Sequence, residues 1–229
     1  TVDPLIQSLK GKLVVSVQAY MGEPLRTPET MLNVSRFELG GAAAIRCQGL
    51  ADIAAIKGRC EVPVIGLWKD GHEAYITPTL RHARACVAAG ADIVAIDATD
   101  RPRPDGKSVE DTFRPLHEEG VLLMADCATI EDIRRAVDMA STWYPPHSLT
   151  VSPPSLHHAD GPDLPLLRQA TEEFPGLPII ARVACIRPRR LALQSTPARG
   201  PLSSARYHAP HEYYKLVQGL RLRRKTGLV

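Results

Sequence analysis

Polar residues that could do chemistry come at or just after the ends of several short apolar runs. Arg46, Asp97 and Asp126 close the runs AAAIR, DIVAID and VLLMAD, and Lys69 follows PVIGL by two residues. A lysine acts as a base near neutral pH when burial and a neighbouring cation disfavour its charged form, and Arg46 could be that cation. From the residues alone, a solvated loop lysine in WKDG is the commoner alternative. Asp97 could cap the loop ATDRPRPDG or contact a substrate, on nearly equal terms.

The apolar runs predict buried parallel strands, because they are apolar throughout instead of alternating with polar residues. The expected strands cover residues 13–17, 42–46, 63–67, 92–97, 121–126 and 177–181. Helices are expected between them, at 27–39, 50–58, 79–89, 108–118 and 129–139, several of them opened by a Ser or Thr that can cap free amides. Strand and helix alternate at the spacing of a βα-repeat, which predicts an α/β fold.

The spacing of the strands predicts a (β/α)8 TIM-type barrel with two poorly specified strands. Strand centres fall near residues 15, 44, 65, 95 and 124, and the next falls near 179, about two βα periods later. A sixth strand is therefore missing near residue 150, and an eighth is missing after residue 181. We expect residues 140–158 and 182–210 to form loops or poorly packed strands.

These two windows are also unusual in composition. Residues 140–158 contain four prolines, three histidines and no charged residue, whereas 182–210 contain six arginines and no acid. Without the second window the net charge of +3 would turn negative, so the basic excess does not indicate a nucleic-acid partner. Long Pro-rich loops are the alternative explanation.

The bulk composition favours one domain over residues 1–229 and a cytoplasmic enzyme. The chain is 44% apolar and 23% charged, and it contains neither an apolar run of membrane-spanning length nor a signal-peptide core. Its five cysteines form no CxxC pair, which predicts buried free thiols and no metal site. His82 and His117 fall on expected helices without a partner that would make them catalytic. The sequence leaves a homodimer open.

The sequence resembles the bacterial N-acetylmannosamine-6-phosphate 2-epimerases. The resemblance rests on VSVQAYMGEPL, GGAAAIRCQG, PVIGLWKDG, YITPTL, GADIVAIDATDRPRPDG and LLMADCAT in this order, and on GPDLPLLRQATEEFPGLPIIA further along. It implies a sugar-phosphate substrate, N-acetylmannosamine 6-phosphate, whose C2 hydrogen is removed and returned on the opposite face to give N-acetylglucosamine 6-phosphate. Such a reaction needs a base and an acid on opposite sides of C2, and no redox cofactor.

The resemblance also assigns roles to individual residues. Lys69 would abstract the proton, Gln18 and Arg46 would hold the sugar oxygens, and Asp126 would be a further substrate ligand. Tyr75, Thr77 and Thr79 would lie in a loop lining the pocket, although Thr79 could equally be a helix N-cap. The family's acid, a glutamate directly after LPIIA, is replaced by Arg182. The phosphate would bind at the loops after strands seven and eight.

Both unusual windows can be explained by a shifted reading frame. A shift of two bases over 181–206 permits EGGVHTPEEASAAIDAGARAVVVGT, which is the family segment missing there, and a shift over 139–158 permits a sixth strand. The frame would return near residue 210, where PHEYYKLVQGL resembles the family's last helix. Two other hypotheses stay open: a barrel that has lost its activity, and a different phosphate-binding barrel enzyme, against which QAYMGEPL and GLWKDG argue.

Overall fold

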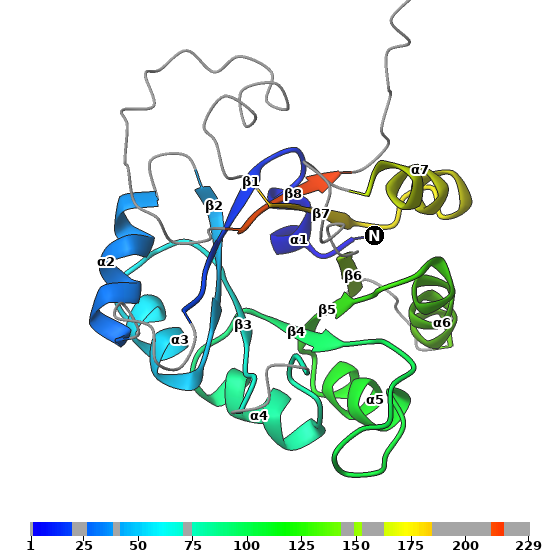
Figure 1. The fold of residues 1–229 in the computed structure, drawn as a ribbon, viewed down its shortest axis with the longest axis horizontal. Helices are drawn as coiled ribbons and strands as arrows, with labels where there is room; N and C mark the ends of the chain where they lie inside the picture. The colour runs from blue at the N-terminus through cyan, green and yellow to red at the C-terminus, as the bar shows by residue number, and fades with distance from the viewer. Residues whose placement is uncertain are drawn as a thin grey trace, which may run out of the picture.

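Eight strands form a closed barrel in the computed structural model, which describes residues 2–19, 27–38, 42–70, 75–142, 149–152, 163–184 and 212–217 (Figure 1). The strands follow one another around the ring in chain order. They are β1 (Leu13–Val17), β2 (Ala42–Gln48), β3 (Val64–Leu67), β4 (Ile93–Asp97), β5 (Leu122–Asp126), β6 (Leu149–Ser152), β7 (Ile179–Ala184) and β8 (Glu212–Val217). The expected α/β barrel of the TIM type is confirmed.

The strands predicted from apolar runs agree closely with the structure. The bounds of β1 to β5 lie within two residues of the prediction, and β7 begins two residues later and ends three residues later. Every residue of β3 and β4 is buried, as expected for strands covered on both faces. Gly66 in β3 lies under α3 (Leu50–Lys57), where an added Cβ would come within 2.8 Å of Ile53 Cδ1. This close approach explains the glycine.

Helices cover the outer face of the ring (Figure 1). Besides α3 they are α2 (Pro28–Glu38), α4 (Leu80–Ala88), α5 (Glu110–Glu118), α6 (Ile130–Ser141) and α7 (Leu164–Glu173). All five helices predicted from the spacing are confirmed. At the start of α6, Thr129 and Asp132 form a capping box, each bonding the other's backbone amide. Among the described residues, no helix has both the length and the apolar character needed to cross a membrane.

Apolar side chains fill the inside of the barrel. Successive strands contribute to this interior cluster, whose members include Val14, Ala44, Ile65, Ile93, Ala95, Met124 and Ile180. The short helix α1 (Pro4–Ser8), with Ile6 and the following Leu9, packs into the same cluster. The barrel interior is therefore a packed core, which leaves the C-terminal ends of the strands as the place for a site.

Strand β6 lies near residue 150, within the window expected to form loops or poorly packed strands, and β8 lies where the sequence indicated a helix. Within the described ranges, β6 pairs with β5 over four residues and shares the single pair Val151↔Ile179 with β7. The expected helix near PHEYYKLVQGL is wrong, because residues 212–217 form β8, antiparallel to both β7 and β1. Without β8 the backbone groups of these two strands would lack partners at the seam. An antiparallel strand can close the seam without a crossover helix.

The cysteines confirm the expectation of burial. Cys47, Cys60, Cys86 and Cys127 are buried in the layer between strands and helices, whereas Cys185 lies outside the described residues. Burial raises the pKa of the Cys86 thiol to about 12. It also raises the pKa of Cys127 well above the usual range. Because a thiolate is the reactive form, neither Cys86 nor Cys127 is suited to nucleophilic chemistry.

Candidate active site

Four strands carry polar or charged residues toward the barrel axis at their C-terminal ends. Val14, Ala44, Ala95 and Met124 belong to the interior cluster, and side chains two residues apart on a strand share a face. The same face therefore continues with Ser16, Arg46, Asp97 and Asp126. In the strand register Ser16 lies beside Arg46, and Asp97 beside Asp126. This polar layer closes the packed interior at the end where barrel enzymes place their chemistry.

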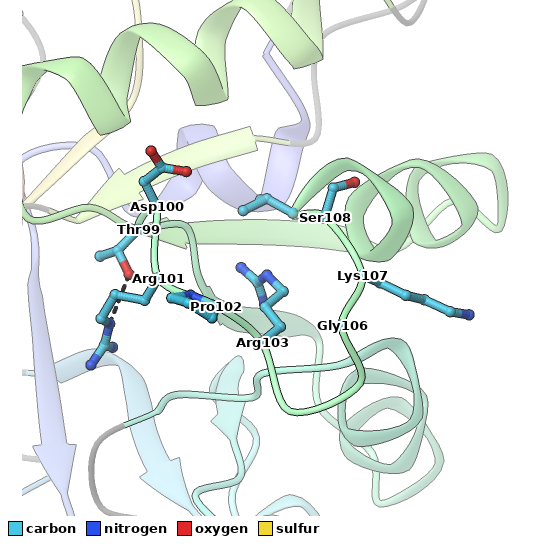
Figure 2. Close-up of a pocket in the computed structure, with 9 residues that line it drawn as sticks. Thr99, Asp100, Arg101, Pro102, Arg103, Gly106, Lys107 and Ser108 are labelled. Carbon is cyan, nitrogen blue, oxygen red and sulfur yellow. Dashed lines mark hydrogen bonds between the residues drawn. The ribbon is translucent and has the colours of Figure 1, made fainter.

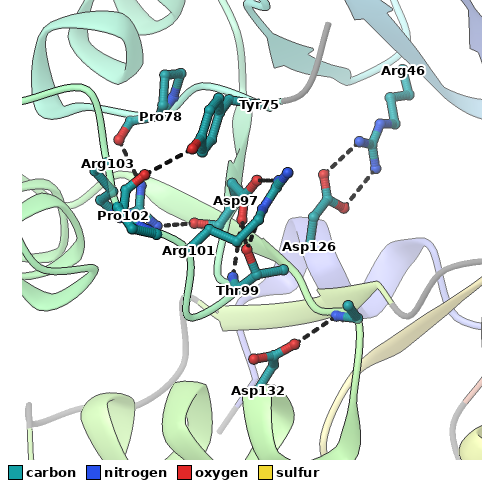
Figure 3. Close-up of polar contacts among 11 residues, drawn as sticks. Arg46, Tyr75, Pro78, Asp97, Thr99, Arg101, Pro102, Arg103, Asp126 and Asp132 are labelled. Atoms are coloured by element: carbon teal, nitrogen blue, oxygen red, sulfur yellow. Dashed lines mark hydrogen bonds and ion pairs between the residues drawn. The ribbon is translucent and has the colours of Figure 1, made fainter.

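Arg46 and Asp126 form a two-pronged ion pair across the barrel. Arg46 Nη1 donates to Asp126 Oδ1 at 3.0 Å and Nη2 to Oδ2 at 2.6 Å (Figure 3). The Arg46 side chain is 2% exposed and that of Asp126 is 14% exposed. A bidentate pair of this kind fixes the orientation of both groups. The structure thus brings together two predicted substrate ligands, and the slight exposure of Asp126 leaves its carboxylate accessible from the barrel mouth.

Asp97 organises the loop that follows β4. Its Oδ1 accepts from the Thr99 amide at 3.0 Å and from the Thr99 hydroxyl at 2.6 Å, and its Oδ2 accepts from Arg101. Figure 3 shows the side chains of Asp97, Thr99 and Arg101 drawn together. Both oxygens are therefore engaged within residues 97–101. This geometry matches the loop-cap interpretation, and a substrate contact by Asp97 stays a prediction.

Lys69 lies two residues beyond β3, in a loop whose two arms are bonded to each other. The Trp68 amide donates to Thr77 Oγ1 at 3.0 Å, and the Thr77 amide donates back to the Trp68 carbonyl, also at 3.0 Å. Thr77 is fully buried, with φ of 49°, and Asp70 has φ of 34°. They are the only non-glycine residues with positive φ in the described part of the chain. Such backbone strain persists only where surrounding contacts enforce it, and it concentrates at functional sites.

Tyr75 joins this loop to the loop after β4. Its hydroxyl donates to the Pro102 carbonyl at 2.8 Å, and the Arg101 guanidinium stacks 4.6 Å from the centre of its ring. Tyr75 thus connects the two loops, whereas Thr77 joins the two arms of the loop after β3. A role of Tyr75 in lining a substrate pocket stays a prediction.

Two glutamines hold the chain after β1. Gln18 Nε2 donates to Ser16 Oγ at 2.7 Å, which keeps this predicted ligand at the end of β1. Gln48 Nε2 donates to the Ala19 carbonyl at 3.0 Å. Gln48 was not predicted as a site residue, although it follows Ala44 and Arg46 on the inward face of β2 and could have been found by that alternation.

A second polar cluster at the Lys69 loop was not predicted. His82 Nδ1 lies 2.6 Å from Thr79 Oγ1, and His82 Nε2 lies 3.0 Å from Asp70 Oδ2. Thr79 is the N-cap of α4, as one interpretation expected, but its hydroxyl bonds His82 in place of a helix amide. Burial lowers the pKa of His82 against the opposing effect of Asp70. His82 thus has Thr79 and Asp70 as partners, and the expectation that neither makes it catalytic stays a prediction.

An open pocket of about 370 Å³ lies within the loop after β4 (Figure 2). Residues 99–103 and 106–109 line it, and the side chain of Lys107 points away from it. None of Gln18, Arg46, Lys69 and Asp126 is among its lining residues. The pocket is thus formed by one loop beside the polar layer, and we do not assign the substrate to it.

Other predicted parts of the site are described incompletely. Arg182 falls within β7 in register with Tyr214, but its side chain and the segments expected to hold the phosphate lie outside the described residues. Within the described ranges, no group of three or more His, Cys, Asp or Glu side chains could hold a metal ion.

Known proteins resemble both the sequence and the fold of this chain. Residues 31–144 match a family model described as "Putative N-acetylmannosamine-6-phosphate epimerase". A relative from Cutibacterium acnes, named "Putative N-acetylmannosamine-6-phosphate 2-epimerase", is 56% identical over 133 residues, which cover 57% of this chain and 58% of that relative. A relative of the same name from Corynebacterium glutamicum is 42% identical over 178 residues and 75% of each chain.

The solved structure of the N-acetylmannosamine-6-phosphate 2-epimerase from Clostridium perfringens aligns with a TM-score of 0.69 and 29% identity, covering 84% of this chain and 85% of that one. A dihydropteroate synthetase aligns with a TM-score of 0.50 at 12% identity, over 74% of this chain and 72% of that one, which shows the barrel fold alone. The matched residues 31–144 include Arg46, Lys69, Asp97 and Asp126. With 42% identity over three quarters of the Corynebacterium relative, the chain belongs to the N-acetylmannosamine-6-phosphate 2-epimerase family.

Proposed function

We propose that this barrel epimerises N-acetylmannosamine 6-phosphate at C2, with Lys69 as the base. The observation that carries the proposal is the place of Lys69, two residues beyond β3 at the barrel end that also holds the Arg46–Asp126 pair. In the open-chain sugar, removal of the C2 proton moves its electron pair into a C1–C2 double bond and leaves negative charge on O1. A neutral lysine amine takes the proton and becomes an ammonium ion.

Arg46 and Asp126 would hold the sugar during this step. A guanidinium donates to hydroxyl and carbonyl oxygens, and a carboxylate accepts from hydroxyls. Because each fixes the other, the pair would meet the substrate with little loss of side-chain freedom. Gln18, whose amide is held by Ser16 at the end of β1, would contact the same sugar from the neighbouring strand.

Replacing Lys69 tests the assignment of the base. In D₂O, N-acetylmannosamine 6-phosphate should exchange its C2 hydrogen for deuterium, which proton NMR detects with or without inversion at C2. Lys69→Met should slow this exchange by about 10²–10⁴-fold. Lys10→Met, at an exposed lysine before β1, is the matched control and should leave the rate unchanged. Equal exchange rates in Lys69→Met and Lys10→Met would exclude Lys69 as the base.

A second candidate is a barrel that binds the sugar phosphate and removes the C2 proton but rarely inverts the configuration at C2. The observation that favours it is Arg182 in β7, at the position where the resemblance puts the glutamate acid. Deuterium would then enter C2 while the product keeps the starting configuration. Rapid appearance of N-acetylglucosamine 6-phosphate from protein whose mass matches this sequence would contradict this candidate.

We further propose that residues 140–158 and 182–210 are read out of frame. The frame-corrected segment EGGVHTPEEASAAIDAGARAVVVGT can replace residues 182–206 without changing the chain length. It places an acid at position 182 in β7 and restores glycine-rich turns that can bind phosphate through backbone amides. We expect the replaced chain to invert C2 at least about 10²-fold faster. An uninterrupted coding sequence without compensating insertions and deletions, together with an inactive replaced chain, would reject the frame hypothesis.

A further inference from the structure

Arg103 is buried between the loop after β3 and the loop after β4. Its Nη1 donates to the Pro78 carbonyl at 2.6 Å, and its Nη2 donates to the Asp97 carbonyl (Figure 3). Arg103 is only 8% exposed, and its Nε has no hydrogen-bond partner among the described residues. Burial of this cation lowers its pKa. Burying a charged side chain with one donor unused destabilises the folded protein. The two hydrogen bonds that Arg103 makes to backbone carbonyls therefore need an explanation.

The contacts of Arg103 lead through the polypeptide to Lys69. Pro78 follows Thr77, and Thr77 is bonded in both directions to Trp68, the residue before Lys69. The same arm of the loop is held at the Ile76 carbonyl, which accepts from the Asp97 amide at 2.7 Å. These contacts enforce the positive φ of Thr77, a conformation that a β-branched residue rarely adopts. Loss of one contact would let this strain relax and move the Trp68–Lys69 backbone.

Arg101 and Tyr75 strengthen the same junction from the solvent side. The Tyr75 hydroxyl bonds the Pro102 carbonyl, and Arg101 stacks on the Tyr75 ring while pairing with Asp97. The Arg101 side chain is 45% exposed, so its contribution is screened by water. Arg103 is therefore the member of the junction whose removal should have the largest effect on the loop.

We propose that Arg103 is a positioning residue for the Lys69 loop: it locks the loop after β3 onto β4 and thereby sets the place of the Lys69 amine. It acts through the backbone and does not touch the substrate. The proposal rests on the proposed function for its effect on catalysis, whereas its effect on the loop is independent of any activity. Misplacing a reacting group by about 1 Å can cost about 10²-fold in rate.

Arg103→Met keeps much of the side-chain length and removes both donors. We expect kcat for C2 deuterium exchange to fall by about 10–100-fold, with KM changing less than about threefold because Gln18, Arg46 and Asp126 are untouched. Arg103→Lys, which can bond one carbonyl, should recover part of kcat. Added guanidinium at millimolar concentration should rescue Arg103→Met along a saturating curve. Arg84→Met, which removes an exposed ion pair with Glu119 between α4 and the end of α5, is the matched control and should show neither loss nor rescue.

Amide hydrogen exchange supplies the readout that does not need turnover. In Arg103→Met, the amides of Ile76, Thr77 and Thr79 and of residues 97–99 should exchange at least about tenfold faster than in the unsubstituted chain, while those of β1 and β2 stay equally protected. If the unsubstituted chain shows no deuterium incorporation at C2, the proposed function fails, and this experiment alone decides the role of Arg103. Unchanged exchange at Ile76, Thr77 and Thr79 would overturn the proposal. An unchanged kcat in an active chain, or a loss shared equally by Arg84→Met, would overturn it as well.

Discussion

Strands β1 to β5 and strands β6 to β8 are joined into the barrel in different ways. In the first group every strand is parallel to the next, and a helix follows each strand. In the second group β6 covers four of the described residues, which share a single register pair with the described part of β7, and β8 runs antiparallel to both of its neighbours. The same barrel therefore combines β1 to β5 and β7, which their own apolar runs specify, with β6 and β8, which complete the edges of their neighbours.

The difference shows what a strand needs in order to be specified locally. β4 has the apolar run IVAID, buried at every residue, and the amphipathic helices α4 and α5 beside it. Its place in the barrel follows from its own side chains and those of its neighbours. β8 joins two strands whose backbone groups need partners, which is a requirement set by residues far away in sequence. The Lys69 loop and the Arg46–Asp126 pair both belong to the first group.

The test with the largest expected effect on stability replaces one buried isoleucine in each group of strands. Ile45 in β2 and Ile179 in β7 are both fully buried in the layer between strands and helices, and each pairs with residues on two neighbouring strands. Ile45→Ala should lower the free energy of unfolding by about 2–5 kcal/mol. Ile179→Ala should cost at least about 1 kcal/mol less, because the sparse pairing of β6 with β7 lets the site collapse around the cavity.

Urea unfolding of both variants, followed by far-UV circular dichroism, measures the two differences. The conservative variants Ile45→Val and Ile179→Val should cost less than the alanine variants in both strands, which checks that cavity size controls the effect. Equal costs for Ile45→Ala and Ile179→Ala would show that the two groups of strands are equally well packed and would remove the distinction.

The sequence predicted the first group of strands and several site residues, for identifiable reasons. Apolar runs placed β1 to β5 and β7, and the last residues of β2, β4 and β5 as predicted placed Arg46, Asp97 and Asp126 at one end of the barrel. β8 could not be predicted, because its pairing depends on the seam between β7 and β1. The contacts of Arg103 and His82 could not be predicted either, since Pro78, Asp97 and Asp70 approach them only through loop conformation. For His82, its place three residues after the N-cap Thr79 was the one local signal.

The N-caps of α6 and α7 allow a test whose expected effect on stability is intermediate. Thr129 Oγ1 accepts from the Asp132 amide at 3.2 Å at the start of α6, and Asp163 Oδ1 accepts from the Leu166 amide at 3.0 Å at the start of α7. Thr129→Ala should cost about 1 kcal/mol and lower Tm by about 2–4 °C, because the capping box is lost. Asp163→Ala should lower Tm by less, since α7 covers the sparsely paired strands. Thr129→Ser keeps the hydroxyl and should behave as the unsubstituted chain, and a larger Tm loss in Asp163→Ala than in Thr129→Ala would reverse the comparison.

The smallest effect on stability is expected at the ion pair between α6, which follows β5, and α7, which follows β6. Arg134 in α6 donates from Nε to Glu173 Oε1 at 2.6 Å and from Nη2 to Oε2 at 2.8 Å in α7. The hydrogen bond from Arg134 lowers the pKa of Glu173 below its usual value. A depressed carboxyl pKa adds stability that is fully present above the unfolded value of about 4.3 and is lost as the pH falls through the folded pKa.

Both side chains of this pair are partly exposed, so solvent and salt screen the interaction. We expect a double-mutant cycle of Arg134→Met and Glu173→Gln to give a coupling at pH 7 that is smaller than the effect of Thr129→Ala. The coupling should weaken in 0.5 M salt, and it should weaken progressively as the pH falls from the unfolded value through the lowered pKa of folded Glu173. A coupling that responds to neither salt nor pH would mean that packing of the side-chain stems, and not charge, holds α7 to α6. The sparsely paired strands would then be stabilised by the same apolar contacts that specify β1 to β5.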